Sequence, residues 1–353
     1  MNTVKKCVAG LSEYSVLQDM GVIKLNQNES PRDIPREVKQ KILSRMETLS
    51  WNRYPPAVPD SLKERLSDYT GFPSSGILIG NGSNELIQTL VYAFCDSGDR
   101  VLVIQPGFSI YERISEIMNV SVVKVPLKKN FSFDVESLIC GSRDVRLMIV
   151  ASPNNPTGTR LTGKQAEQLL KGVSCPVVID EAYYEFSGQS FTKFIQKGFP
   201  LFVLRTFSKA FCLAGLRLGY VLGAGKNILQ LGKAKLPFSV DIFSQIAGEV
   251  LMENRSFLES NLREIVQERE RVYAELKKCP GISPYRSSAN FILFRCEGMK
   301  GTQLFRRLYE QGILVRSFRE ACLSDMLRVT VGRAEENTLF LEKMADIMQG
   351  GKK

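Results

Sequence analysis

The chain has 353 residues, of which 44% are apolar and 24% charged, so it is long enough to form one large or two unequal globular domains. Its formal charge of +10 is spread along the chain and no nucleic-acid-binding motif accompanies it, so nucleic-acid binding is not expected. No apolar run approaches the length of a membrane span, so membrane binding is not expected either. Histidine is absent, which excludes imidazole bases and most transition-metal sites, and no metal is expected.

The first 30 residues are expected to form an N-terminal arm, followed by a large domain over residues 31–237. From about residue 76 to 235, short apolar runs alternate with amphipathic stretches. This alternation predicts an α/β fold in which helices sandwich a mostly parallel, seven-stranded sheet. The runs expected to be strands are 77–79, 101–104, 120–125, 147–150, 177–179, 201–204 and 220–222.

Pro237 interrupts this pattern, and a smaller α+β domain is expected over residues 238–353. Long helical stretches come first, and short apolar runs alternate with further helices after them. We expect helices at 241–252, 257–278, 303–309 and 335–348, and strands at 291–294, 313–315 and 327–331.

Polar motifs follow four of the predicted strands, at the edge where parallel sheets bind ligands. The first is Gly80–Glu85, whose glycines let backbone amides approach a phosphate at the start of a helix. It lacks the third glycine of a dinucleotide-binding fingerprint, so NAD is not expected. A plain turn with a helix cap would explain the same residues.

The next two motifs bring polar side chains to the same edge. In Ser152–Gly158, two prolines and a glycine make a rigid turn that can aim an asparagine amide into a cleft. The alternative is a tight strand-to-helix connection, but such a turn would not need the paired asparagines.

Asp180 ends a buried strand, where a carboxylate is costly unless it is paired. A protonated ring nitrogen would be a fitting partner, and Tyr183 could reach the same ligand, although a helix-capping aspartate is an alternative.

The fourth motif follows the apolar run at 201–204. Two hydroxyls, a lysine and an arginine suit a cofactor that carries both an aldehyde and a phosphate. Lys209 can form an imine with the aldehyde, while Thr206, Ser208 and Arg217 hold the phosphate. Taken alone, Lys209 could equally be a solvated surface lysine.

Together these motifs resemble those of the fold-type I aminotransferases, which use pyridoxal 5'-phosphate. The resemblance covers almost the whole chain and implies a large domain with a mostly parallel sheet and a smaller α+β domain. Within this family the chain most resembles the histidinol-phosphate aminotransferases, on residues 25–31, 52–55 and 315–318. The four motifs that stand in the family's order are Ser-Pro-Asn-Asn-Pro-Thr-Gly, Asp-Glu-Ala-Tyr, Thr-x-Ser-Lys-Ala-x-x-x-x-Gly-x-Arg and Leu-Arg-Val-Thr-Val-Gly.

The resemblance implies roles around the cofactor ring. Lys209 matches the lysine that binds the cofactor covalently and moves the Cα proton, and Asp180 matches the acid that keeps the ring nitrogen protonated. Asn155 and Tyr183 match groups that hydrogen-bond the ring's phenolic oxygen. Phe108 falls where an aromatic residue stacks on the ring; tyrosine is usual there in close relatives, so a hydroxyl is lost.

The resemblance also implies a phosphate site that two subunits share. Tyr54 matches a tyrosine that reaches the cofactor phosphate from the other subunit, which implies a homodimer. Relatives often carry an acid where Asn84 stands, so only its backbone is expected to contribute. The residues that match the ligands from the same chain are Thr206, Ser208 and Arg217, with the backbone groups of Gly82, Ser83 and Asn84.

For the substrate, Arg328 matches the anion-binding arginine. A guanidinium can pair with a carboxylate or a phosphate, so one residue could serve both glutamate and a phosphorylated amine. Arg316 and Tyr14 match further contacts to the substrate phosphate, and Asn155 is also expected to face the substrate. A surface salt bridge for Arg316 and a packing role for Tyr14 are the alternatives.

The implied reaction moves an amino group between L-histidinol phosphate and 2-oxoglutarate, giving imidazole-acetol phosphate and glutamate in histidine biosynthesis. Threonine-phosphate decarboxylation is the close alternative and an aromatic aminotransferase a third, because the sequence does not show which Cα bond lies perpendicular to the ring. A non-catalytic cofactor-binding regulator is disfavoured, since both Lys209 and Asp180 are present. Eight scattered cysteines without a Cys-x-x-Cys pair favour reduced thiols and a cytoplasmic location.

Overall fold

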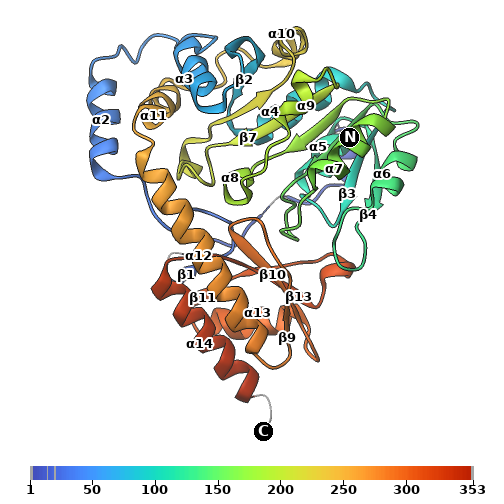
Figure 1. Cartoon of the computed structure of the whole chain (residues 1–353), viewed down its shortest axis with the longest axis vertical. Coiled ribbons are helices and arrows are strands. Elements are labelled where there is room, and N and C mark those ends of the chain that lie inside the picture. The colour runs from blue at the N-terminus through green and yellow to red at the C-terminus, as the bar shows by residue number, and fades with distance from the viewer. Residues whose placement is uncertain (1–2, 14, 20, 351–353) are drawn as a thin grey trace.

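A computed structural model describes residues 3–13, 15–19 and 21–350. Its centre is a seven-stranded sheet with the strand order β2-β8-β7-β6-β5-β3-β4, in which every neighbouring pair is parallel except the two that involve β8. All seven predicted strands are present, which confirms the α/β fold (Figure 1). The strands are β2 (Ile77–Gly80), β3 (Arg100–Gln105), β4 (Ser121–Pro126), β5 (Leu147–Ala151), β6 (Val177–Asp180), β7 (Leu201–Thr206) and β8 (Gly219–Leu222).

The apolar runs become central strands because both faces of this sheet are covered. Every residue of β5, β6, β7 and β8 is buried. One face packs on the helices α2 (Arg36–Glu47), α3 (Asp60–Thr70), α6 (Val135–Gly141), α7 (Gly163–Gly172), α9 (Thr192–Gln196) and α11 (Ile242–Glu253). The other face packs on α4 (Gly82–Phe94), α5 (Ile110–Ile117) and α10 (Gly225–Ala234).

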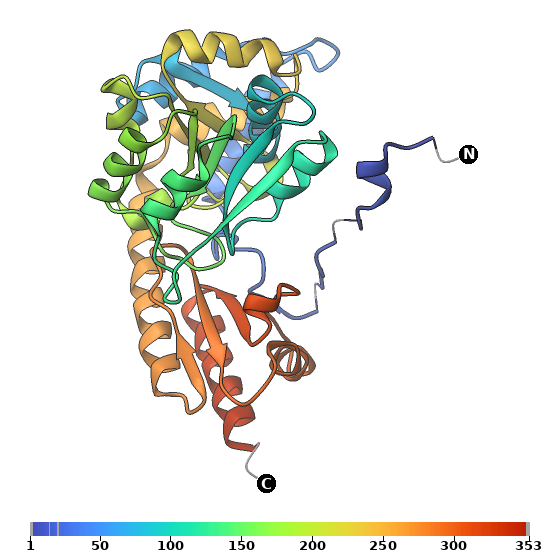
Figure 2. The ribbon, with the colours of Figure 1, turned by 90° about the vertical axis from the view of Figure 1, so that its right-hand side faces the viewer.

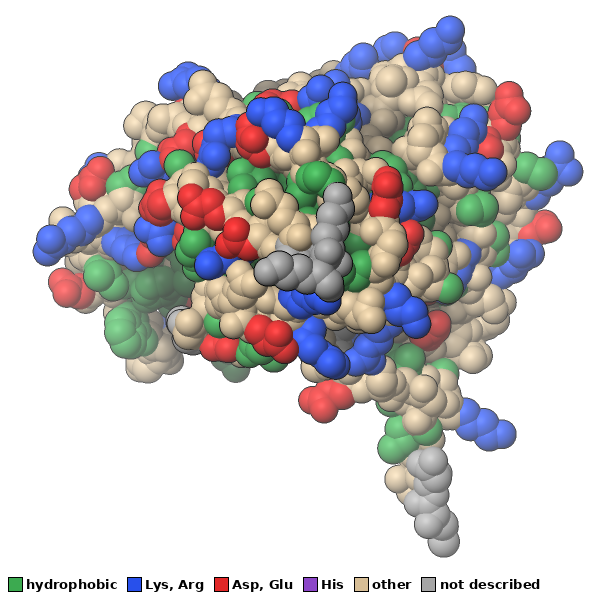
Figure 3. Space-filling view, turned by 90° about the horizontal axis from the view of Figure 1, so that it is seen from below, with side chains coloured by type: hydrophobic (Ala, Val, Ile, Leu, Met, Phe, Trp, Pro, Cys, Tyr) green, Lys and Arg blue, Asp and Glu red, His purple; other side chains and the backbone are tan. Residues whose placement is uncertain are grey.

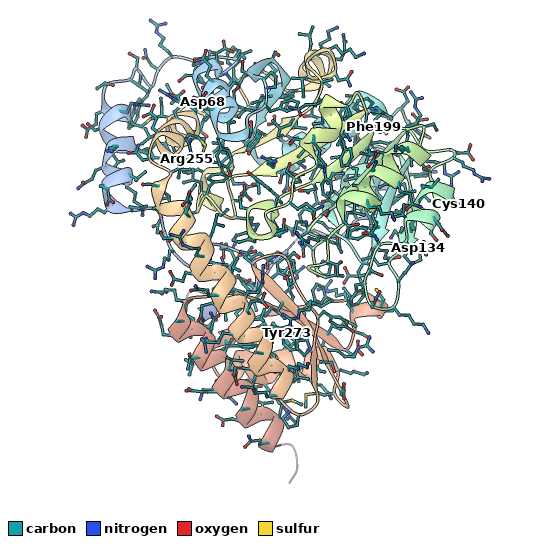
Figure 4. All side chains as sticks on the ribbon, viewed as in Figure 1. Asp68, Asp134, Cys140, Phe199, Arg255 and Tyr273 are labelled. Carbon is teal, nitrogen blue, oxygen red and sulfur yellow. The ribbon has the colours of Figure 1, made fainter. Side chains whose placement is uncertain are left out.

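A second, antiparallel sheet has the order β12-β13-β10-β9 and packs on three helices. The longest of them, α12, runs from the large sheet to the small one, and Arg255 and Tyr273 mark its course in Figure 4. The bounds are α12 (Ser256–Lys278), β9 (Ile282–Pro284), β10 (Phe291–Cys296), α13 (Gly301–Glu310), β12 (Arg316–Ser317), β13 (Met326–Thr330) and α14 (Ala334–Gly350). A short α8 (Tyr184–Ser187) contacts α12 from the large sheet.

The strand predicted over 313–315 covers only two residues, and a second strand that was not predicted follows it in the other small sheet. β11 (Ile313–Leu314) pairs in parallel with β1 (Ile23–Lys24), whereas Arg316 and Ser317 pair with β13. The prediction missed this because β1 comes from almost 300 residues earlier in the chain.

The segment before β1 lies at one side of the molecule and extends from the level of the small sheet to that of the large sheet (Figure 2). Its short helix α1 (Lys6–Ala9) contacts α5, and Arg113 of α5 donates to the carbonyl of Ser12 at 2.8 Å. The domain division into residues 1–30, 31–237 and 238–353 stays a prediction.

Charges of both signs are interspersed on the face seen from below (Figure 3). The positive charge on that face is therefore not gathered into one uniform basic surface. Across residues 3–13, 15–19 and 21–350, no helix combines the length and apolar character that a membrane crossing requires.

Candidate active site

The parallel strands β5, β6 and β7 end side by side, and the residues that follow them surround a cavity of about 470 Å³. This is the size of a site for a cofactor or small ligand. The small sheet closes the cavity from the opposite side through β12 and β13. The predicted site residues that line it are Ser83, Asn84, Phe108, Asn155, Asp180, Tyr183, Thr206, Ser208, Lys209, Arg217, Arg316 and Arg328.

Asp180 lies at the end of β6 and is only 4% exposed. Its Oδ1 accepts from the backbone amide of Ala182 at 3.0 Å, and its Oδ2 accepts from the Tyr111 hydroxyl at 2.6 Å. Burial raises the pKa of Asp180 to about 6, although the Tyr111 bond opposes the rise. A cationic ring nitrogen beside this carboxylate would offset the cost of burying its charge.

Lys209 follows β7 and points toward the N-terminal segment, where its Nζ donates to the carbonyl of Gln27 at 2.9 Å. Burial, together with the nearby charge of Arg328, lowers the pKa of Lys209 to about 7. A lysine with this pKa loses its proton around pH 7, and the neutral amine is the form that attacks an aldehyde. The solvated surface lysine considered from the sequence is therefore wrong.

A cradle for an anion forms beside Lys209. Ser208 receives hydrogen bonds from Thr206 Oγ1 at 3.0 Å and from Arg217 Nη1 at 3.2 Å. Gly82 opens α4 with a φ of 71°, and a Cβ on it would lie 2.7 Å from the Arg217 guanidinium. Glycine is therefore required here both for its backbone angle and for the close approach of Arg217.

Tyr183 and Phe108 lie near the Asp180 carboxylate. The Tyr183 hydroxyl receives a hydrogen bond from Asn28 Nδ2 at 3.0 Å, and its ring packs edge-on against Phe291. Phe108 packs edge-on against Tyr111, with 5.5 Å between the ring centroids. Both aromatic side chains are thus held by neighbours and border the cavity.

Arg328 and Arg316 lie directly opposite each other on the antiparallel strands β13 and β12. Arg328 is 6% exposed; one of its nitrogens donates to the Asn155 side-chain oxygen, and the other donates to the carbonyl of Asn26 at 2.7 Å. Like charges directly opposite each other in a sheet repel. Because both arginines line the cavity, an anion between them would remove the repulsion.

Among the described residues, Gly82 and Tyr54 are the predicted site residues that do not line this cavity. Tyr54 is 82% exposed and stacks on Phe238, with 4.7 Å between the centroids. It does not line the cavity of its own chain, so a role in the same subunit has no support. Tyr14 lies outside the described residues.

A family model described as aminotransferase class I and II matches residues 20–344. The chain belongs to the class I and II aminotransferases. It is 39% identical to a histidinol-phosphate aminotransferase of Aquifex aeolicus, with 95% of each chain covered. It is 35% identical to one of Chlorobium phaeovibrioides, covering 99% of this chain and 98% of that one. The crystal structure of the histidinol-phosphate aminotransferase from Clostridium acetobutylicum matches with a TM-score of 0.86 at 28% identity, covering 93% of this chain and 100% of that one.

Membership of this aminotransferase family confirms the predicted enzyme class, a transaminase that uses pyridoxal phosphate. The cavity of this aminotransferase also fits the cofactor. It holds an amine that loses its proton around pH 7, a desolvated carboxylate and an arginine. These three groups line one cavity and suit, in turn, the aldehyde, the ring nitrogen and the phosphate of the cofactor.

Four of the cavity residues that sequence reasoning missed make hydrogen bonds to predicted site residues. Tyr111 follows Phe108 by three residues and so lies on the same side of a helical turn, a spacing that could have suggested it. The sequence analysis used Asn26, Gln27 and Asn28 only as part of the segment 25–31 that carries the family resemblance, and it assigned them no role in the site. Their contacts with Arg328, Lys209 and Tyr183 join residues about 155 to 302 positions apart, which no local pattern reveals.

Proposed function

We propose that this aminotransferase interconverts L-histidinol phosphate and 2-oxoglutarate with imidazole-acetol phosphate and L-glutamate. The observation that carries the proposal is the pair of arginines, Arg316 and Arg328, facing each other across β12 and β13 at the cavity. A phosphate dianion or a carboxylate could pair with both guanidinium groups. The identity to histidinol-phosphate aminotransferases over nearly the whole chain supports this choice of substrate.

When bound, pyridoxal phosphate supplies an aldehyde for covalent attachment of an amine and a protonated ring that withdraws electrons from the substrate Cα. Lys209 is the residue that we propose attaches to the aldehyde. Once the substrate amine had displaced it, its neutral Nζ would take the proton from the substrate Cα and pass it to the carbon that the cofactor contributes as its aldehyde. Its lowered pKa suits both tasks.

Asp180 would hold the positive charge on the ring nitrogen. Tyr111 and the amide of Ala182 keep its two carboxylate oxygens in place. Phe108 would lie against one face of the ring, and Tyr183 and Asn155 would donate to its phenolic oxygen. The phosphate would occupy the cradle of Thr206, Ser208 and Arg217, together with the backbone amides of Gly82, Ser83 and Asn84.

The two substrates are proposed to use the arginine pair in turn. Histidinol phosphate has no α-carboxylate, so its phosphate would lie between Arg316 and Arg328. The carboxylates of glutamate would meet the same guanidinium groups in the second half-reaction. Tyr14 is kept as a proposed further contact to the substrate phosphate.

We also propose a homodimer in which Tyr54 reaches the cofactor phosphate of the partner. Tyr54, Trp51, Leu236 and Phe238 are exposed apolar side chains on two neighbouring loops. The same loops adjoin the phosphate cradle, because Asn81 Nδ2 donates to the carbonyl of Ser239 at 3.0 Å. A partner that covered this surface would bring its own Tyr54 toward the cradle.

We also propose a cytoplasmic location. The free state of all eight cysteines accords with it.

The deciding experiment offers the purified, cofactor-loaded enzyme each candidate amine separately. With histidinol phosphate and 2-oxoglutarate, we expect equal amounts of imidazole-acetol phosphate and glutamate, measured by mass spectrometry and a coupled glutamate assay. Threonine phosphate should release no carbon dioxide. Release of carbon dioxide, or faster transfer from an aromatic amino acid than from histidinol phosphate, would overturn the assignment.

A further inference from the structure

Asn26 is a buried amide that borders the cavity and has one unused hydrogen-bonding atom. The residue is 3% exposed and immediately precedes Gln27, whose carbonyl accepts from Lys209. Its own carbonyl accepts from Arg328 at 2.7 Å, and its Nδ2 donates to the carbonyl of Leu17 at 2.9 Å. Its Oδ1 is buried and has no hydrogen-bond partner among the described residues.

The orientation of this amide is determined by its neighbour. The carbonyl of Leu17 can only accept, so the nitrogen of Asn26 must face it. The oxygen consequently faces the other way and cannot be exchanged with the nitrogen by a flip. A buried acceptor without a donor costs free energy, and this cost is recovered if a bound ligand supplies an N–H or O–H.

The cationic side chains in the cavity have the opposite requirement, although Gln27 Oε1 is a second buried acceptor without a partner among the described residues. Lys209, Arg217, Arg316 and Arg328 are donors, and they suit phosphates and carboxylates. Glutamate and 2-oxoglutarate present carboxylates beyond the reacting carbon, and these bring acceptors only. The imidazole ring of histidinol phosphate brings an N–H donor. Asn26 Oδ1 therefore matches the one part of that substrate which the arginines cannot recognise.

We propose that Asn26 determines specificity for the phosphorylated amine by accepting a hydrogen bond from its ring N–H. The inference rests on the proposed function and adds the chemical feature by which this site selects its amino donor. Asn26 does not touch the reacting carbon, so it acts on the choice of substrate. Its attachment to the N-terminal segment through Leu17 also makes that segment part of the substrate site.

The test compares histidinol phosphate with its two ring-N-methyl derivatives, at a pH above 8 where the imidazole is neutral. Methylation at either nitrogen removes the N–H donor. We expect the wild-type enzyme to prefer the unmethylated substrate about tenfold in kcat/KM. In Asn26→Ala this preference should fall to about one, because the acceptor is gone. Persistence of the tenfold preference in Asn26→Ala would overturn the proposal.

Two controls separate recognition from a structural effect. Asn26→Ala keeps the backbone carbonyl that binds Arg328, so the glutamate half-reaction should stay within about twofold of wild type, and an equal loss for both substrates would count against the proposal. Leu17→Ala keeps the carbonyl that Asn26 contacts while truncating a half-exposed side chain. It should therefore retain the tenfold preference.

A binding measurement keeps the inference testable if Asn26→Ala folds poorly or if histidinol phosphate is not the substrate. Binding of 3-(imidazol-4-yl)propyl phosphate, which has the ring and phosphate but no reactive amine, can be measured by calorimetry. Its affinity should drop about tenfold on ring methylation in wild type and stay unchanged in Asn26→Ala. Equal affinities in wild type would refute the role of Asn26 independently of turnover.

Discussion

The hydroxyl of Tyr111 donates to Oδ2 of Asp180 at 2.6 Å, and both side chains are buried. Tyr111 comes from α5 and Asp180 from the end of β6, so the bond joins a helix on one face of the sheet to the ligand-binding edge. The proximity of the carboxylate and burial together raise the pKa of the Tyr111 hydroxyl well above its usual value. Tyr111 therefore remains a donor at every physiological pH and holds Asp180 in one orientation.

Tyr111→Phe should weaken cofactor binding by removing this donor. A hydrogen bond to a charged group contributes about 1.5–3 kcal/mol, so the dissociation constant of pyridoxal phosphate should rise about tenfold or more. The pKa of Asp180 should rise above about 6, because the bond that lowers it is lost. The check is a titration of cofactor-free protein with pyridoxal phosphate between pH 5 and 8. Tyr285→Phe, outside the cavity, serves as the control, and equal affinities in the two variants would contradict this role for Tyr111.

Lys209→Ala should abolish covalent attachment of the cofactor and all turnover. No other lysine lines the cavity formed by the described residues, so no second amine can replace Lys209. The measurement is loss of the visible absorbance of the bound cofactor, together with loss of glutamate formation. Lys235→Ala is the matched control, since burial also lowers the pKa of Lys235 but this residue lies outside the cavity. Turnover by Lys209→Ala would refute the covalent role.

The rate at which cofactor-free protein captures pyridoxal phosphate should rise with pH through about 7, where Lys209 loses its proton. The sign follows from the amine, because only its neutral form above the pKa is a nucleophile. In Arg328→Met the midpoint should move to higher pH, since the Arg328 charge helps to lower the pKa of Lys209. Stopped-flow absorbance measures the rate. Arg316→Met is the comparison, and an identical midpoint in Arg328→Met and wild type would exclude this coupling.

Arg205→Met should destabilise the protein severely, because it leaves Glu181 buried without its ion-pair partner. Arg205 and Glu181 are 3% and 0% exposed and lie 2.8 Å apart, beside Thr206 and Asp180 respectively. Breaking a buried pair costs about 3–5 kcal/mol of unfolding free energy. Denaturant unfolding provides the measurement. Arg286→Ala removes an exposed pair with Glu270 and should cost less than about 1 kcal/mol; comparable losses would argue against burial as the cause.

The shared phosphate site can be tested with mixed dimers of Lys209→Ala and Tyr54→Phe. If Tyr54 acts on the partner, a mixed dimer contains one site with both changes and one site with neither. The active fraction should then bind the cofactor as wild type does, although Tyr54→Phe alone binds it about tenfold more weakly. Fluorescence titration of separately tagged, purified mixed dimers measures this. Retention of the Tyr54→Phe affinity would place the tyrosine in its own subunit or outside the site.

Much of the site could be predicted because its residues stand at the ends of recognisable strands. Asp180, Thr206 and Lys209 each follow an apolar run whose every residue is buried, and parallel strands bring such ends to one edge. The same reasoning could not find Asn26 or place Arg316 opposite Arg328. Those relationships depend on the pairing of short segments from distant parts of the chain.

The sequence by itself determined the α/β class, the seven strands of the large sheet and the residue types that suit an aldehyde and a phosphate. It could do so because hydrophobic periodicity and strand-end motifs are local properties of the chain. Only the tertiary structure decided that Lys209 is a partly buried amine with a lowered pKa, that Tyr111 holds Asp180, and that an acceptor on Asn26 has no donor among the described residues. Burial and hydrogen-bond pairing depend on which distant segments meet, and they decide the charge state and the orientation of each group.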